Sequence, residues 1–295
     1  MKTKISNGIA LILTLFIISI SAISSDAQQS KSNISTIKSS GYAPVNGLKM
    51  YYEIHGEGKP IVLLHGSYMS IDLNYGQLIP DLAKSHKVIA LEMQGHGRTA
   101  DIDRPFSFVA LADDVDGLLK YLHIDSADVL GYSLGATVGL ELAIRHPAVV
   151  NKLVFISSAY KFEGWSKATR DMLPTLKPEF FEKTPLKTDY DRLAPDKNHW
   201  KQFVTKLLQF DATPFDLGAE NIKAIKSPVL IINGDNDGVD LSHVADLYKL
   251  CGGSVFADMV GLPKSQLAIV PAATHVSLMM ETQKLASLIH PFLNK

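Results

Sequence analysis

The chain has little cysteine, little net charge and few long apolar runs. Its 295 residues include one cysteine, Cys251, so no intramolecular disulfide is possible and the fold depends on its hydrophobic core. The formal net charge at pH 7 is −1, and no dense run of Lys or Arg follows the N-terminus. Because nucleic acids and anionic membranes are bound through basic patches, neither is an expected partner. The 46% hydrophobic and 20% charged residues are typical of a soluble globular protein.

The longest apolar run lies at the N-terminus, from Ile9 to about Ile23, after two lysines and before small residues that end at Ala27. This order of basic, apolar and small residues predicts a secretory signal peptide over residues 1–27, and therefore a periplasmic or secreted protein. An uncleaved membrane anchor is the alternative, since the run approaches the length of a short membrane span. Residues 28–40 are rich in Ser, Lys and Gln and are expected to form a flexible mature N-terminus.

From Gly41 onward, strand-like and helix-like patterns alternate, which indicates an α/β fold with a mostly parallel sheet covered on both faces. Asn46-Gly47 is a two-residue hairpin signal. Strands are expected at Tyr42–Val45, Leu48–Ile54, Ile61–Leu64, Val88–Leu91, Ala127–Tyr132, Lys152–Ser157, Val229–Asn233 and Leu267–Val270. Helices are expected from Phe108 to Leu122, with Asp113, Asp114 and Asp116 on the outer face, from Leu134 to His146, and through Leu285 to Phe292.

Residues 160–222 interrupt this alternation, because they contain no convincing strand. An insertion of this length needs its own packing and is expected to form a helical cap, while 41–159 and 223–295 form the core. The segment contains eight large aromatics, which are Trp165, Phe180, Phe181, Tyr190, Trp200, Phe203, Phe210 and Phe215. Most of them are expected in the interior of the cap, with one or two lining a substrate pocket.

The run Gly131-Tyr-Ser-Leu-Gly135 follows an apolar strand and precedes a helix rich in small residues. This is the setting of a strand-to-helix nucleophile elbow, in which the flanking glycines allow the strand and the helix to approach closely. The pattern predicts Ser133 as a nucleophile at the C-terminal edge of the sheet.

A serine nucleophile needs a base and an orienting carboxylate. His275 lies just past the last strand, and Asp237 lies in the loop after the strand that ends at Gly234. Loops after parallel strands emerge at one edge, so these side chains can meet Ser133 there. Asp235 and Asp240 are rivals of Asp237 for the orienting role.

Acyl transfer also needs donors for the developing oxyanion. The expected donors are the backbone N–H groups of Leu134 and Ser67, the second in the loop after the strand that ends at Leu64, with Tyr68 beside it as a substrate-binding residue. His65 and His96 lie in Gly-flanked loops, where structural hydrogen bonding is the expected role.

The chain resembles the α/β-hydrolase fold superfamily from about Tyr42 to its C-terminus. The motifs that carry the resemblance are Leu64-His-Gly-Ser67, Gln94-Gly-His-Gly-Arg98, Gly131-Tyr-Ser-Leu-Gly135, Gly234-Asp-Asn-Asp237 and Thr274-His275. The resemblance implies a mostly parallel eight-stranded sheet with helices on both faces, a helical cap after the sixth strand, and a Ser133–Asp237–His275 triad. The segment between Asp237 and His275 is longer than usual for the family, and an added loop beside the site is expected there.

These features predict a serine hydrolase of a small or medium carboxylic ester or lactone, acting through an acyl-enzyme. No metal ion and no organic cofactor are expected, and the partner is a small ester-like molecule bound in part by Trp165 of the cap. A carbon–carbon bond hydrolase or a cofactor-free perhydrolase would use the same triad. The contrasting class is a ligand-binding protein on the same fold, against which the complete triad argues.

Overall fold

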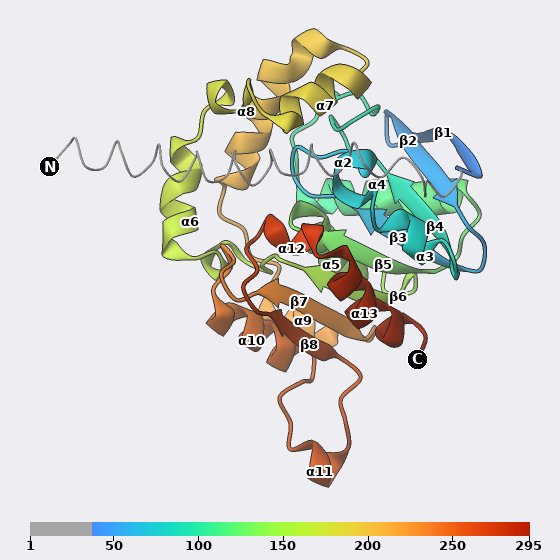
Figure 1. Ribbon diagram of the computed structural model, residues 1–295, viewed down its shortest axis with the longest axis vertical. Helices are drawn as coiled ribbons and strands as arrows, with labels where there is room; N and C mark the ends of the chain where they lie inside the picture. Colours follow the sequence, from blue (N-terminus) through green and yellow to red (C-terminus); the bar gives the residue numbers. More distant parts are fainter. Residues whose placement is uncertain (1–36) are drawn as a thin grey trace, which may run out of the picture.

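The computed structural model describes residues 37–295, so the expected signal peptide and most of the expected flexible N-terminus lie outside the described residues. Eight strands form one sheet in the order β1-β2-β4-β3-β5-β6-β7-β8. β2 pairs antiparallel with β1 and with β4, and the remaining neighbours pair parallel. The expected mostly parallel eight-stranded sheet is therefore confirmed (Figure 1). The strands are β1 Ser39–Val45, β2 Leu48–His55, β3 Lys59–Leu64, β4 His86–Leu91, β5 Ala127–Tyr132, β6 Val150–Ile156, β7 Val229–Gly234 and β8 Gln266–Val270.

The first two strands form the expected hairpin. Asn46 and Gly47 have φ values of 47° and 87°, and positive φ at both central residues is the requirement of a type I′ turn. The sheet begins at Ser39, so the last two residues of the segment expected to be flexible belong to β1, and Lys38 N–H already donates to Ile54 O at 2.9 Å. The composition of residues 28–40 did not indicate a strand, because the hydrogen bonds of Ser39 and Ser40 depend on their pairing with β2.

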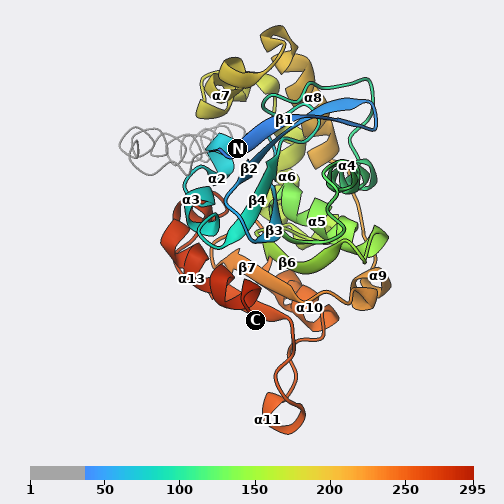
Figure 2. The ribbon, with the colours of Figure 1, turned by 90° about the vertical axis from the view of Figure 1, so that its right-hand side faces the viewer.

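Helices cover both faces of the sheet, with α4 and α5 on one side and α3 and α13 on the other (Figure 2). The apolar face of α4 buries Leu111, Val115 and Leu118 in one core cluster, while Leu285 and Ile289 of α13 belong to the other. The helices are α2 Ile71–Tyr75, α3 Ile79–Leu82, α4 Phe108–Tyr121, α5 Leu134–Arg145, α6 Lys167–Met172, α7 Pro185–Leu193, α8 Trp200–Asp211, α9 Ala219–Ala224, α10 Leu241–Leu250, α11 Ala257–Val260, α12 Ser277–Met280 and α13 Thr282–Leu293, with short 3₁₀ turns at Phe162–Gly164, Leu173–Thr175, Pro178–Phe181 and Lys197–His199.

The expectation that Asp113, Asp114 and Asp116 lie on the outer face of α4 is wrong for two of the three. Asp114 and Asp116 are buried, and only Asp113 is partly exposed. Arg104 donates to Asp114 at 3.0 Å, and Lys120 pairs with Asp116 at 2.6 Å. A carboxylate is tolerated inside when a cation pairs with it. Arg104 comes from the loop before α4 and Lys120 from the next turn of α4 itself, and the apolar periodicity of the helix reports neither pairing.

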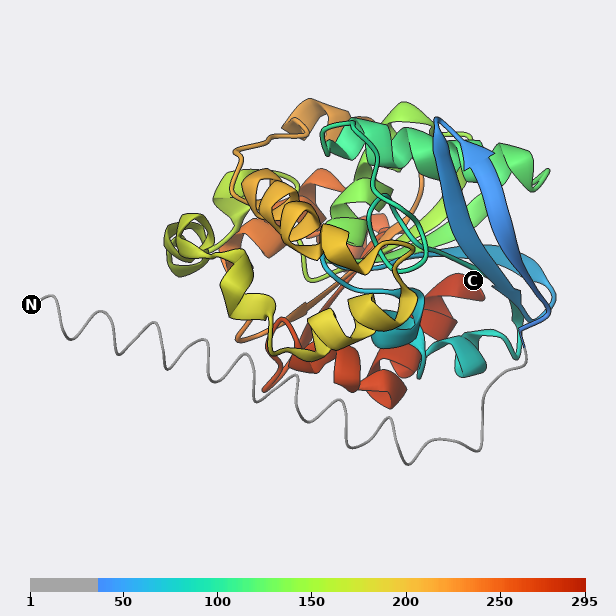
Figure 3. The ribbon, with the colours of Figure 1, turned by 90° about the horizontal axis from the view of Figure 1, so that it is seen from above.

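Short helices occupy residues 160–222, between β6 and β7. Seen from above, this cap lies across the body of the sheet and its helices (Figure 3). The segment from Cys251 to Ser265, with α11 at its tip, projects from the opposite end of the molecule (Figure 1). It enters β8 at the strand's N-terminal end, whereas His275 follows the C-terminal end, so the expected added loop beside the site is wrong. Among residues 37–295, no helix is long and apolar enough to cross a bilayer.

Candidate active site

Ser133 lies at the sharp turn between β5 and α5, with φ 53° and ψ −119°. A non-glycine residue rarely adopts positive φ, and such strain is kept only where the surrounding structure enforces it. Ser133 N–H donates to Ile156 O of β6 at 3.0 Å, which holds the turn against the neighbouring strand. The turn presents the Ser133 hydroxyl at the C-terminal edge of the sheet.

Both glycines of the elbow are required by close backbone contact. A Cβ at Gly131 would lie 2.2 Å from Gly135 O, and a Cβ at Gly135 would lie 2.0 Å from Leu64 O. These distances are below van der Waals contact, and the opposing atoms belong to backbone that cannot move aside. The pattern Gly-x-Ser-x-Gly is therefore a packing requirement of this strand–helix crossing.

His275 joins the serine to a carboxylate. Its Nε2 lies 3.1 Å from Ser133 Oγ, and its Nδ1 lies 3.0 Å from Asp237 Oδ1. Tyr132 OH donates to His275 O at 2.8 Å, and the edge of Trp165 faces the imidazole with ring centroids 5.6 Å apart. The imidazole is thus held from several sides, and the structure brings together the three residues expected from the sequence.

The carboxylate of Asp237 is fully buried. Burial opposes its ionisation, but the charge of His275 and the hydrogen bonds from His275 and from Val239 N–H outweigh that effect, so its pKa is lowered. An ionised Asp237 accepts a hydrogen bond from His275 Nδ1–H and leaves Nε2 free to take a proton from the serine.

The two rival aspartates lie elsewhere. Asp235 is exposed and accepts a hydrogen bond from Ala273 N–H at 3.2 Å, so it ties the β7 loop to the β8 loop. Asp240 precedes α10 as its N-cap. Of the three acids in this segment, Asp237 is the one that contacts His275.

The loop after β3 is fixed by side chains from the core. Gly66 N–H donates to Asn74 Oδ1 at 2.7 Å, and Tyr68 N–H donates to His96 Nε2 at 3.1 Å. Tyr68 itself has a φ of 66°. Hydrogen bonds on both sides of Ser67 therefore set the direction of its backbone N–H.

His65 and His96 have structural roles, as expected. Met93 N–H donates to His65 Nε2, so the proton of that ring is on Nδ1 and points to Gly66 O at 2.8 Å. His96 Nε2 is likewise an acceptor, with its Nδ1 2.8 Å from Gln94 O. Burial lowers the pKa of both imidazoles, that of His96 to about 4, so both are neutral at pH 7.

The backbone N–H groups of Ser67 and Leu134 donate to no protein atom among the hydrogen bonds of the described residues. Leu134 is the first residue of α5, where a helix leaves its N–H groups without partners and where its dipole favours negative charge. Ser67 and Leu134 both line the cavity that contains Ser133. Two free donors next to a nucleophile meet the requirement for an oxyanion site.

The catalytic cavity has a volume of about 300 Å³ and lies between the sheet edge and the cap. This is the small end of the range for ligand pockets. Tyr68 and Trp165 line it, as expected. Five of the eight cap aromatics line it, rather than the expected one or two, and these are Trp165, Phe180, Phe181, Phe210 and Phe215. The short cap helices form a thin layer, so one side of many aromatics faces the cavity.

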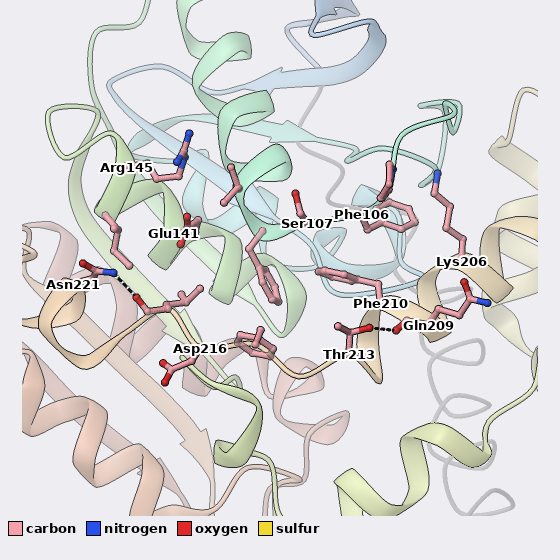
Figure 4. Close-up of a pocket in the computed structure, with 16 residues that line it drawn as sticks. Phe106, Ser107, Glu141, Arg145, Lys206, Gln209, Phe210, Thr213, Asp216 and Asn221 are labelled. Atoms are coloured by element: carbon pink, nitrogen blue, oxygen red, sulfur yellow. Dashed lines mark hydrogen bonds between the residues drawn. The ribbon is translucent and has the colours of Figure 1, made fainter.

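A second, more open groove lies between the cap helix α8 and the core helices α4 and α5 (Figure 4). Glu141 and Arg145 border it on α5, and Lys206 and Phe210 border it on α8. Phe210 also lines the catalytic cavity and therefore separates the two spaces. No residue of the triad lines the outer groove, whereas Ser133 and His275 line the inner cavity.

One residue of the cavity had no assigned role at the level of sequence. Asp211 ends α8 and accepts hydrogen bonds from Tyr68 OH at 3.0 Å and from Ser67 Oγ at 3.4 Å. No motif surrounds it, and only the folding of the cap over the β3 loop brings these residues together. Within residues 37–295, no cluster of His, Cys, Asp and Glu is arranged to hold a metal ion.

Comparison with known families and sequences agrees with this fold. A family model described as alpha/beta hydrolase fold matches residues 59–212. The chain is 25% identical over 278 residues to the AB hydrolase superfamily protein YisY of Bacillus subtilis, which covers 83% of this chain and 95% of that protein. It is 36% identical over 116 residues to a 2-hydroxymuconate semialdehyde hydrolase of Pseudomonas sp., but this match covers only 38% of the chain and 41% of that relative.

Among solved structures, an enol-lactonase from Burkholderia xenovorans superimposes with a TM-score of 0.65 at 22% identity. The match covers 86% of this chain and 100% of the lactonase. At this level of identity the likeness concerns the fold.

Proposed function

Because this chain belongs to the alpha/beta hydrolase fold family, and because consecutive hydrogen bonds join Ser133, His275 and the buried Asp237, we propose that it is a serine hydrolase of small or medium carboxylic esters or lactones. The observation that carries the proposal is the 3.1 Å contact from His275 Nε2 to Ser133 Oγ, continued by the 3.0 Å contact to Asp237. This is the geometry that general-base activation of a hydroxyl needs.

In the proposed reaction Ser133 Oγ attacks the ester carbonyl carbon while its proton passes to His275 Nε2. The oxyanion of the tetrahedral intermediate accepts hydrogen bonds from the backbone N–H groups of Leu134 and Ser67. His275 then donates the proton to the leaving alcohol, and an acyl-enzyme remains on Ser133. A water molecule, deprotonated by the same imidazole, attacks the acyl-enzyme, and His275 returns the proton to Ser133 Oγ as the acid is released.

The size and the lining of the cavity support a small or medium substrate. Its volume of about 300 Å³ and its mostly aromatic and aliphatic walls suit an uncharged acyl or alkyl group. A carbon–carbon bond hydrolase with the same triad is the second candidate, and the similarity to a 2-hydroxymuconate semialdehyde hydrolase supports it.

The test is the turnover of 4-nitrophenyl acetate and butyrate by the wild type and by Ser133→Ala. We expect kcat to fall by about a thousandfold or more in Ser133→Ala, because the remaining donors cannot replace a nucleophile. Ser158→Ala is the matched control, since Ser158 lines the same cavity without contacting His275, and it should retain activity within severalfold. A fluorophosphonate probe should label Ser133 in the wild type. Equal ester turnover in wild type and Ser133→Ala would refute the mechanism, and ligand-induced stabilisation without turnover would identify a binding protein.

A further inference from the structure

The catalytic cavity contains one carboxylate that the proposed reaction does not use. Asp211 and His275 are the residues with readily ionisable side chains on its walls, and no Lys or Arg is among the lining residues. Asp211 is also the last residue of α8, where the helix dipole disfavours negative charge. A carboxylate that faces an apolar cavity from the unfavourable end of a helix is a candidate for recognition of the substrate.

Among residues 37–295, two side chains bond to Asp211. Tyr68 OH donates to Oδ2 at 3.0 Å, and Ser67 Oγ donates to Oδ1 at 3.4 Å. A carboxylate has about four lone-pair positions, so acceptor capacity is left over. The nearest cationic residue on the same helix, Lys206, pairs with Asp101 at 2.9 Å and does not neutralise Asp211.

Burial raises the pKa of Asp211 to about 7, although the hydrogen bonds from Tyr68 and Ser67 act in the opposite direction. The group is therefore mostly ionised at pH 8.5 and mostly protonated at pH 5.5. Its position next to Ser67 places it close to the oxyanion donor of the proposed reaction, so a substituent a few atoms from the reacting carbonyl would meet it.

We propose that Asp211 is a specificity-determining residue that disfavours substrates with a carboxylate near the reacting carbonyl and favours uncharged esters or lactones that carry a hydroxyl or N–H donor. Two like charges in a cavity of low polarity repel strongly, whereas a donor can use the free acceptor positions of Asp211. A substrate such as a 2-hydroxymuconate, which is by its name a carboxylate, would therefore bind poorly here. This inference rests on the proposed ester hydrolysis and narrows its substrate class.

The test compares three methyl esters at pH 8.5 by titration of the released acid: methyl butyrate, methyl 3-hydroxybutyrate and monomethyl succinate. In the wild type we expect kcat/KM for the hydroxy ester to exceed that for butyrate, and kcat/KM for the succinate to fall at least tenfold below it. In Asp211→Asn this deficit, the factor by which kcat/KM for the succinate falls below that for butyrate, should shrink by tenfold or more. The change should come mainly from KM, because the removed charge acts on binding. Asp216→Asn is the matched control, since it removes an equal charge from the same part of the cap outside the catalytic cavity, and it should leave the deficit unchanged.

A second measurement varies the pH. Lowering the pH from 8.5 to 5.5 protonates Asp211, so the ratio of kcat/KM for the succinate to that for butyrate should rise more in the wild type than in Asp211→Asn, in which only the substrate's own carboxyl group gains protons. Tyr68 faces Asp211 from the β3 loop and is not charged in this range, because burial raises its pKa. His275 faces the same cavity from the β8 side, but it serves as the base for both substrates, so its contribution cancels in the ratio.

The outcomes separate the two proposals. Failure to hydrolyse methyl butyrate, together with no labelling of Ser133, would refute the proposed function. Hydrolysis of methyl butyrate with an undiminished succinate deficit in Asp211→Asn, or with a ratio that rises no more in the wild type than in Asp211→Asn as the pH falls, would refute the role of Asp211 alone.

Discussion

At the scale of single residues, the orientation of one side chain distinguishes Asp237 from Asp235. The two acids are separated by one residue in the same loop, yet Asp237 is fully buried against His275 while Asp235 is exposed. Asp237 also accepts a hydrogen bond from Val239 N–H at 3.3 Å, so its own loop holds the carboxylate toward the imidazole.

This difference gives a paired prediction. Asp237→Asn should lower kcat for 4-nitrophenyl butyrate by about 10³ or more, because an amide that donates to Nδ1 would stabilise the wrong tautomer of His275. Asp235→Asn should lower kcat by about twofold or less. Steady-state kinetics at pH 8 measures both, and a larger loss in Asp235→Asn would assign the orienting role to that residue.

At the scale of elements, the crossing of β5, β3 and α5 decides where the nucleophile lies. Gly135 brings the first turn of α5 against the backbone of Leu64, whereas Gly139, one turn later, faces the ends of the Leu153 and Val129 side chains. Both glycines are on the same helix, but only the first lies against rigid backbone.

We expect Gly135→Ala to lower the free energy of unfolding by roughly 3 kcal/mol or more, since the new methyl group would overlap Leu64 O. Gly139→Ala places its methyl group 3.0 Å from Leu153 Cδ1, a side-chain atom that can shift, and alanine favours the helix. Gly139→Ala should therefore change the free energy of unfolding by about 1 kcal/mol or less. Urea titration followed by circular dichroism measures both variants. Equal effects would show that α5 can move away from the backbone of Leu64 without loss of stability.

At the scale of the whole molecule, the cap and the apolar tip at α11 lie at opposite ends (Figure 1), and the tip segment leads into the N-terminal end of β8. The tip carries Phe256, Met259 and Leu262, which are 69%, 76% and 88% exposed. The catalytic cavity is bounded by the cap and by the C-terminal ends of the strands, and no tip residue lines it.

The triple change of Phe256, Met259 and Leu262 to serine should therefore leave kcat/KM for 4-nitrophenyl butyrate within twofold of the wild type. Light scattering of concentrated samples should decrease, because exposed apolar patches promote association. A large loss of kcat/KM with unchanged thermal stability would show that the tip acts on the site.

The sequence by itself determined the sheet and the positions of the proposed nucleophile and base. Strands in a parallel sheet are short apolar runs, and the elbow depends on glycines in fixed positions, so both are visible as local patterns. The positions of Ser133, Asp237 and His275 at strand ends follow from the same alternation. Local patterns also explain the correct assignment of His65 and His96 to structural roles.

Only the tertiary structure decided the contacts that join segments far apart in the chain. The burial of Asp114 depends in part on Asn46 of the β1–β2 turn, which donates to it from 68 positions away, and the direction of the 251–265 excursion depends on which end of β8 it enters. Asp211 meets Tyr68 because the cap folds over the β3 loop, across 143 positions of the sequence. Periodicity reports which face of an element is apolar, but the charge and the shape of a cavity come from the side chains that several elements place around it.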